Sequence, residues 1–184
     1  LCVALATVFM AASAWAGTIL EVKHNPGSGQ YGSVTAALAV ATDGDTIEII
    51  DNSAPFVEQV YINGETLSKN NLIVRGKVGL NPRPTILGNG TVSPLDAGLG
   101  NIVLTYCNNV DGLRIENLII KASSADNVTV DARFWNGATF LNCQIDGRLA
   151  KTNAFRSQVN TTLDRCEILG APNTIDHFFG GPLN

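Results

Sequence analysis

The residues of this chain best suited to chemistry on a ligand are charged and aromatic side chains in its second half. Asp131 and Arg133 alternate with the apolar residues Val130 and Ala132, so in a β-strand both charged side chains point away from the core. Arg156 is expected one repeat later, above Arg133. Arginine pairs with the carboxylates of acidic sugars and aromatic rings stack on sugar faces, so we predict a polysaccharide-binding face. The residues assigned to it are Asp131, Arg133, Arg156 and Trp135, with Phe134 and Tyr106 nearby.

This assignment has a simpler alternative. Asp131 and Arg133 can also form a salt pair two residues apart on a solvated strand face, with no ligand involved.

The sequence contains few residues or motifs that could bind a metal ion or a cofactor. Calcium requires several converging oxygen ligands, and a tight turn accounts for Asp43 and Asp45. His24 and His177 are the only histidines, and no zinc, nucleotide or serine-hydrolase motif is present. We therefore expect no metal and no cofactor.

The elements that must position these residues follow an internal repeat. Residues 114–120 (RIENLII), 139–145 (TFLNCQI) and 162–168 (TLDRCEI) align without a gap, and they begin 25 and 23 residues apart. A period near 24 with short strands fits one turn of a parallel β-solenoid, in which turns stack about 4.8 Å apart. We predict an all-β, right-handed parallel β-helix.

The repeat places particular residues one above another. Leu118, Cys143 and Cys166 share one inward column, and we expect the two thiols to stack as small buried side chains rather than form a disulfide, because a disulfide needs closer Cβ atoms. Asn117 and Asn142 fall where two inward positions are three residues apart, so the chain must bend there. Their amides are expected to form a hydrogen-bonded ladder.

A short helix is expected before the first full turn. Ser33 is a plausible N-cap, and apolar residues follow at i, i+3, i+4 and i+7 from Val34 to Ala41. This helix, over about 33–42, would cover the open N-terminal end of the solenoid. Strands are predicted near 102–107, 112–120, 128–133, 137–145, 154–159 and 161–168.

The ends and the net charge of the chain lead to predictions about its localisation and its partners. Residues 1–16 are uncharged and end in Ala14-Trp15-Ala16, which is typical of a secretory signal peptide cleaved before Gly17. We expect one β-helix domain over 17–184, incomplete at its C-terminus, that is secreted or on the cell surface. The net charge of −4 without a Lys/Arg run argues against nucleic acid. We expect no membrane span in the mature segment, and a monomer.

Several motifs resemble a known superfamily. Residues 27–34 (GSGQYGSV) and 43–49 (DGDTIEI) resemble the opening of pectin-lyase-like right-handed parallel β-helix proteins. There, GSG-aromatic-x-(S/T)-(I/V) leads a cap helix and DGDTI leads the first turn. Residues 112–118 (GLRIENL) are similar to their G-(L/F)-x-I-x-N-L coil. The resemblance covers nearly all of the chain after residue 16 and implies the fold, but the superfamily includes lyases, hydrolases, esterases and adhesins.

One branch of that superfamily implies a catalytic residue. Residues 175–180 (IDHFFG) resemble the (I/V)-D-F-I-F-G motif of pectin methylesterases, which makes Asp176 the candidate nucleophile. Such an esterase needs a second carboxylate for proton transfer. The family's glutamine and acid/base motifs have no counterpart at 129–133 and 147–151, and Asp146 lies at a turn. The alternative for Asp176 is a turn residue that caps backbone groups.

These observations lead to three functional hypotheses. The first is a secreted or cell-surface module that binds polysaccharide along one stacked face of the solenoid. The second is a carbohydrate-active enzyme of pectinesterase or pectate-lyase type, and the third is a structural or adhesive solenoid.

Overall fold

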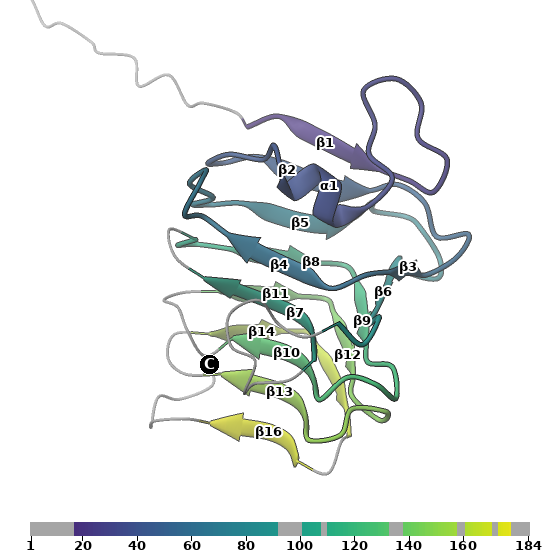
Figure 1. The fold of residues 1–184 in the computed structure, drawn as a ribbon, viewed down its shortest axis with the longest axis vertical. Coiled ribbons are helices and arrows are strands. Elements are labelled where there is room, and N and C mark those ends of the chain that lie inside the picture. Colours follow the sequence, from purple (N-terminus) through teal and green to yellow (C-terminus); the bar gives the residue numbers. More distant parts are fainter. Residues whose placement is uncertain are drawn as a thin grey trace, which may run out of the picture.

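The computed structural model describes residues 17–91, 101–107, 110–132, 138–157, 161–170 and 173–177. Their strands wind into a parallel β-solenoid of about 5 turns with three sheets along its length (Figure 1). This confirms the predicted all-β solenoid. The described part of the candidate catalytic motif, residues 175–177, lies in β16, at the far end from β1.

Each sheet takes one strand from each turn. Sheet A contains β1 (Ile19–Val22), β2 (Thr46–Ile49), β5 (Ile73–Gly76), β8 (Arg114–Glu116), β11 (Thr139–Leu141) and β14 (Thr162–Asp164). Sheet B contains β3 (Phe56–Val57), β6 (Thr85–Leu87), β9 (Ile119–Lys121), β12 (Gln144–Asp146) and β15 (Glu167–Leu169). Sheet C contains β4 (Val60–Asn63), β7 (Ile102–Cys107), β10 (Val128–Ala132), β13 (Asn153–Ser157) and β16 (Asn173–His177).

The strand register reproduces the sequence repeat. Phe140 in β11 lies between Ile115 and Leu163 in sheet A, and Ile145 in β12 lies between Ile120 and Ile168 in sheet B. Because each turn buries the same positions, the core is a set of apolar columns along the axis.

The bend between sheets A and B explains why each predicted long strand is two short ones. Asn117 and Asn142 have φ angles of 55° and 51°, a left-handed conformation that asparagine tolerates. Asn142 Nδ2 donates to Asn117 Oδ1 at 3.0 Å, and Asn117 Nδ2 donates to the Gly76 carbonyl at 3.1 Å. The ladder is confirmed, and Arg165 takes the same conformation one turn later, with φ of 51°.

The cysteine column is also confirmed. Cys143 is buried, Cys166 is half-buried, and both are free thiols. Backbone hydrogen bonds from Gln144 to Leu118 and from Glu167 to Cys143 place the three residues of this column in successive turns. A hydrogen bond between the two thiols raises the pKa of Cys143 and lowers that of Cys166.

The helix α1 (Val34–Leu38) is shorter than predicted but buries the predicted face. Ser33 accepts a hydrogen bond from the Ala36 amide at 3.0 Å, which confirms it as the N-cap. The regular helix ends early because the Val40 amide bonds back three residues, to Ala37, and starts a turn. Its apolar side chains join the core of the N-terminal turns, and α1 lies against β1, β2 and β4.

The predicted signal peptide and the predicted absence of a membrane span remain to be compared with the structure. Residues 1–16, assigned to a signal peptide, lie outside the described residues, as do 178–184. Within the described part of the chain, no helix is long and apolar enough to cross a membrane.

Candidate functional site

The residues predicted for polysaccharide binding lie on sheet C, where the register corrects one expectation. Arg156 in β13 is opposite Asp131 in β10, not above Arg133, and Asp176 in β16 is opposite Arg156. On the other side, Asp131 is opposite Thr105 of β7, which is opposite Tyr61 of β4. These five positions form one column along the solenoid, here named the sheet C column.

We expected Asp131 to lie on an open face, and the structure shows that it does not. It is fully buried, and the Arg156 side chain is only 15% exposed. Arg156 Nη1 lies 3.8 Å from Asp131 Oδ2, and Arg156 Nε donates to Asn153 Oδ1 at 2.9 Å. Two charges that are buried lose their hydration, and their mutual attraction offsets this cost only when they lie close together and have further hydrogen bonds. In this structure the pair therefore ties neighbouring strands together.

The other predicted residues of this face are only partly described. Arg133, Phe134 and Trp135 lie outside the described residues, and for Tyr106 and Asp176 the backbone alone is described. The structure thus places Asp131, Arg156 and the Asp176 backbone in one column.

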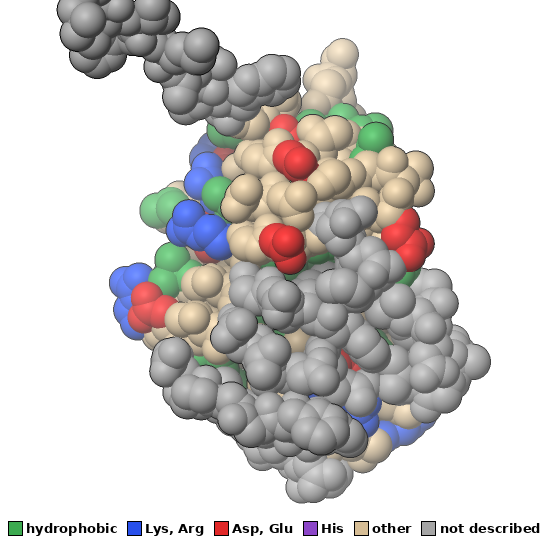
Figure 2. All heavy atoms as spheres, turned by 90° about the vertical axis from the view of Figure 1, so that its left-hand side faces the viewer, with side chains coloured by type: hydrophobic (Ala, Val, Ile, Leu, Met, Phe, Trp, Pro, Cys, Tyr) green, Lys and Arg blue, Asp and Glu red, His purple; other side chains and the backbone are tan. Residues whose placement is uncertain are grey.

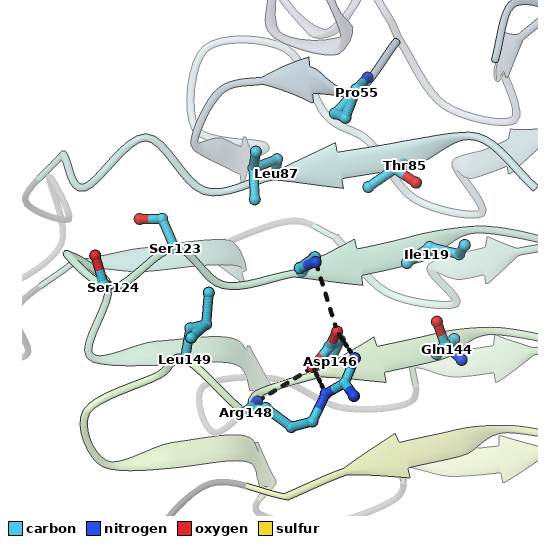
Figure 3. Close-up of a pocket in the computed structure, with 11 residues that line it drawn as sticks. Pro55, Thr85, Leu87, Ile119, Ser123, Ser124, Gln144, Asp146, Arg148 and Leu149 are labelled. Carbon is cyan, nitrogen blue, oxygen red and sulfur yellow. Dashed lines mark hydrogen bonds and ion pairs between the residues drawn. The ribbon is translucent and has the colours of Figure 1, made fainter. Parts of the chain in front are cut away.

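A hollow that sequence reasoning missed lies on the outer side of sheet B (Figure 3). Its volume is about 560 Å³, within the size range of small-molecule sites. We call it the sheet B groove. Its lining residues are Pro55, Thr85, Leu87, Ile119, Lys121, Ser123, Ser124, Gln144, Asp146, Arg148 and Leu149.

The floor of the sheet B groove follows from strand alternation. In β9, Ile120 is buried in the core while Ile119 and Lys121 on either side of it line the groove. The register stacks Ile119 between Thr85 and Gln144, and Lys121 between Leu87 and Asp146. The apolar side chains of the floor, Leu87 and Ile119, therefore lie in β6 and β9, and both groove residues of β12 are polar.

The polar end of the groove is organised by Asp146. Its side chain is 5% exposed and accepts from Arg148 Nε at 2.9 Å and Nη2 at 2.8 Å. Lys121 Nζ lies 4.0 Å from the same carboxylate. The hydrogen bonds from Arg148 lower the pKa of Asp146, against the opposing effect of burial, and Asp146 raises the pKa of Arg148. The carboxylate of Asp146 and the guanidinium of Arg148 therefore stabilise each other's charged form.

One wall of the groove is held by a second buried carboxylate. Asp126 accepts from the Ser123 amide and the Ser123 hydroxyl, both at 2.7 Å, and from the Gly90 amide at 3.2 Å. It is 1% exposed. These bonds fix the turn that carries Ser123 and Ser124 at the rim.

A signal for this groove was present in the repeat. The outward positions flanking the inward isoleucine read Thr-x-Leu, Ile-x-Lys and Gln-x-Asp in β6, β9 and β12. Sequence reasoning placed Asp146 at a turn. It is instead the last residue of β12, with its carboxylate buried under Arg148.

Charge elsewhere on the surface is mixed. On the face shown in Figure 2, described Lys and Arg side chains lie along the left edge and again near the bottom, and the acidic ones are separate from one another. Within the part of the chain that the structure describes, no three His, Cys, Asp or Glu side chains come together as a metal site.

Comparison with known proteins gives no relative from which to transfer a function. No protein-family model, no curated protein and no solved structure matches the chain. It is characterised by its architecture: a parallel β-solenoid with a groove on sheet B and a buried ion pair on sheet C.

Proposed function

We propose that this chain binds a polysaccharide, and that the sugar chain lies in the sheet B groove. The observation that carries the proposal is the groove itself, a hollow of about 560 Å³ with an apolar floor and polar groups at one end. Apolar patches take up the faces of sugar rings, while amide and charged groups bond their hydroxyls.

The repeat of the solenoid supports an extended ligand. Equivalent positions recur about every 4.8 Å along the axis, and the groove is lined from β6, β9 and β12. A polymer lying along the axis would meet two outward side chains from each of these strands in turn. The motif resemblance to β-helix proteins that act on polysaccharides supports the same ligand class, and secretion or surface exposure would bring the protein to it.

Affinity electrophoresis against a panel of soluble neutral and acidic polysaccharides tests the proposal. We expect at least one polysaccharide to retard the protein, and we expect Thr85→Met, which places a longer side chain on the groove floor, to weaken the retardation several-fold. Val78→Met is the matched control, because Val78 is 84% exposed and is not among the groove residues. The proposal fails if no polysaccharide retards the protein, or if both variants behave alike.

A second candidate is a carbohydrate esterase with Asp176 as nucleophile. One observation favours it: Asp176 lies in register beside Arg156, and a guanidinium near the reacting carbonyl would stabilise an oxyanion. In this reaction the carboxylate attacks the carbonyl carbon of a methyl ester, and methoxide leaves and takes a proton from water to become methanol. The hydroxide that remains attacks the resulting anhydride, which releases the sugar carboxylate and regenerates the Asp176 carboxylate.

Methanol release from methyl-esterified pectin separates this candidate from simple binding. The esterase hypothesis predicts release that disappears in Asp176→Asn and persists in Asp111→Asn, a change at an exposed aspartate. Absence of release from the folded wild-type protein would eliminate the esterase and leave the binding proposal intact.

A further inference from the structure

We infer that the polar end of the sheet B groove is a subsite for one anionic substituent of the glycan, a carboxylate or a sulfate ester. Its ligands are Lys121 and Arg148, and Asp146, which forms an ion pair with each of them, is the positioning residue. Figure 3 shows the Arg148 side chain against Asp146. This inference rests on the proposed function and adds to it the chemical class of the ligand.

The first argument is the difference in exposure among the three charged groups. The Asp146 side chain is 5% exposed, whereas Lys121 is 41% exposed and Arg148 is 64% exposed. A ligand entering the groove therefore meets the two cations and not the carboxylate. Without Asp146, the two cations would repel each other, so the buried carboxylate allows both to converge on one place.

The second argument is the number of hydrogen-bond donors left for a ligand. Asp146 takes bonds from Nε and Nη2 of Arg148, and a guanidinium carries further N–H groups in the same plane. Lys121 contributes an ammonium with three donors, and its contact with Asp146 is a 4.0 Å ion pair. Both cations thus retain donors for a carboxylate or sulfate, which accept several charge-assisted hydrogen bonds.

The third argument is the way the fold fixes the spacing of the cations. Lys121 and Asp146 are opposite each other in neighbouring strands, so their backbones are held about 4.8 Å apart. Arg148 lies two residues after Asp146 and is tied to it through its side chain and its backbone amide, at 3.2 Å. A ligand that uses both cations therefore needs little further ordering of the side chains.

The other charged group near this end sets a limit to the subsite. Glu167 in β15 accepts from Gln144 Nε2 at 2.6 Å and acts electrostatically on Arg148. Its negative charge disfavours a second anion on that side. The subsite therefore takes one anionic group, with the rest of the sugar extending over the apolar floor toward Leu87 and Ile119.

The test is an NMR titration of the ¹⁵N-labelled protein with glucose, glucuronate and glucose 6-sulfate. We expect glucuronate, glucose 6-sulfate or both to shift the Arg148 Nε–H signal and the Leu149 amide, with glucose at least fivefold weaker. The two charged sugars distinguish a carboxylate from a sulfate as the preferred group. Binding should weaken as salt rises, and Lys121→Ala should weaken it about five- to tenfold, while Lys77→Ala, which removes an exposed cation outside the groove, should not.

Asp146→Asn separates positioning from net charge. If Asp146 only subtracted charge, this variant would bind glucuronate more tightly than the wild type. If it orients Arg148 and Lys121, as we infer, the variant binds more weakly although it has one negative charge fewer.

The outcomes distinguish this inference from the proposed function. Equal shifts with glucose and the charged sugars would overturn the anionic subsite and leave polysaccharide binding standing. No shift of the groove signals with any of the three would also overturn the subsite, while electrophoresis of the Thr85→Met variant decides the proposed function separately. Tighter binding by Asp146→Asn would overturn the positioning role.

Discussion

Replacing Phe140 with alanine is expected to lower the free energy of unfolding by about 3–5 kcal/mol. Phe140 is fully buried in β11, between Ile115 and Leu163 of the neighbouring turns. Its ring meets the Phe155 ring edge to face, with centroids 5.4 Å apart and an interplanar angle of 87°. The substitution leaves a cavity in the middle of the solenoid, where the facing sheets cannot collapse without breaking register.

Urea unfolding followed by circular dichroism measures this loss. The matched control is Phe140→Leu, because leucine already occupies the same column one turn later, at Leu163. We expect the leucine variant to lose about 1–2 kcal/mol, with most of the volume kept. If Phe140→Ala unfolded with the same midpoint urea concentration as the wild type, the packing of apolar columns in the core would be contradicted.

Replacing Asp126 with alanine is expected to cost about 2–4 kcal/mol and to weaken glycan binding. The carboxylate is 1% exposed and accepts three hydrogen bonds, from the Ser123 amide, the Ser123 hydroxyl and the Gly90 amide. Removing it leaves these donors without their acceptor in a site from which water is largely excluded, and bonds to charged acceptors contribute about 1.5–3 kcal/mol each. The turn that carries Ser123 and Ser124 then loses its anchor at the rim of the sheet B groove.

Two measurements on the same variant check this prediction. Urea unfolding reports the stability, and affinity electrophoresis under native conditions reports the effect on binding. Asp111→Ala is the control, because Asp111 is exposed and changes at such positions usually stay within about 0.5 kcal/mol. If Asp126→Ala and Asp111→Ala lower the free energy of unfolding equally, the hydrogen bonds at Asp126 do not stabilise the turn that carries Ser123 and Ser124.

The solenoid contains buried carboxylates in two different settings. On sheet C, Asp131 and Arg156 are withdrawn from solvent and brace neighbouring strands. On sheet B, only the carboxylate of Asp146 is withdrawn, and its two cationic partners remain accessible. The same pair of residue types is therefore structural on one face and available to a ligand on the other.

The sequence by itself determined the solenoid, because a parallel coil stacks each residue on its equivalent one period later. The repeat of residues 114–120, 139–145 and 162–168 thus predicted the register, the cysteine column, and the bend at Asn117 and Asn142, all of which depend on neighbouring turns alone. The N-cap at Ser33 could also be predicted from the sequence, because its hydrogen bond is to the amide of a residue only three positions later.

Only the tertiary structure decided which outward side chains meet solvent. Asp131 and Lys121 both alternate with core residues, but Asp131 is buried while Lys121 opens into the sheet B groove. Exposure of an outward position depends on everything that packs around it in space, and this surrounding does not follow the period of the repeat. The alternation of residues therefore showed which side chains point outward, and the tertiary packing around each position decided which of them a ligand can reach.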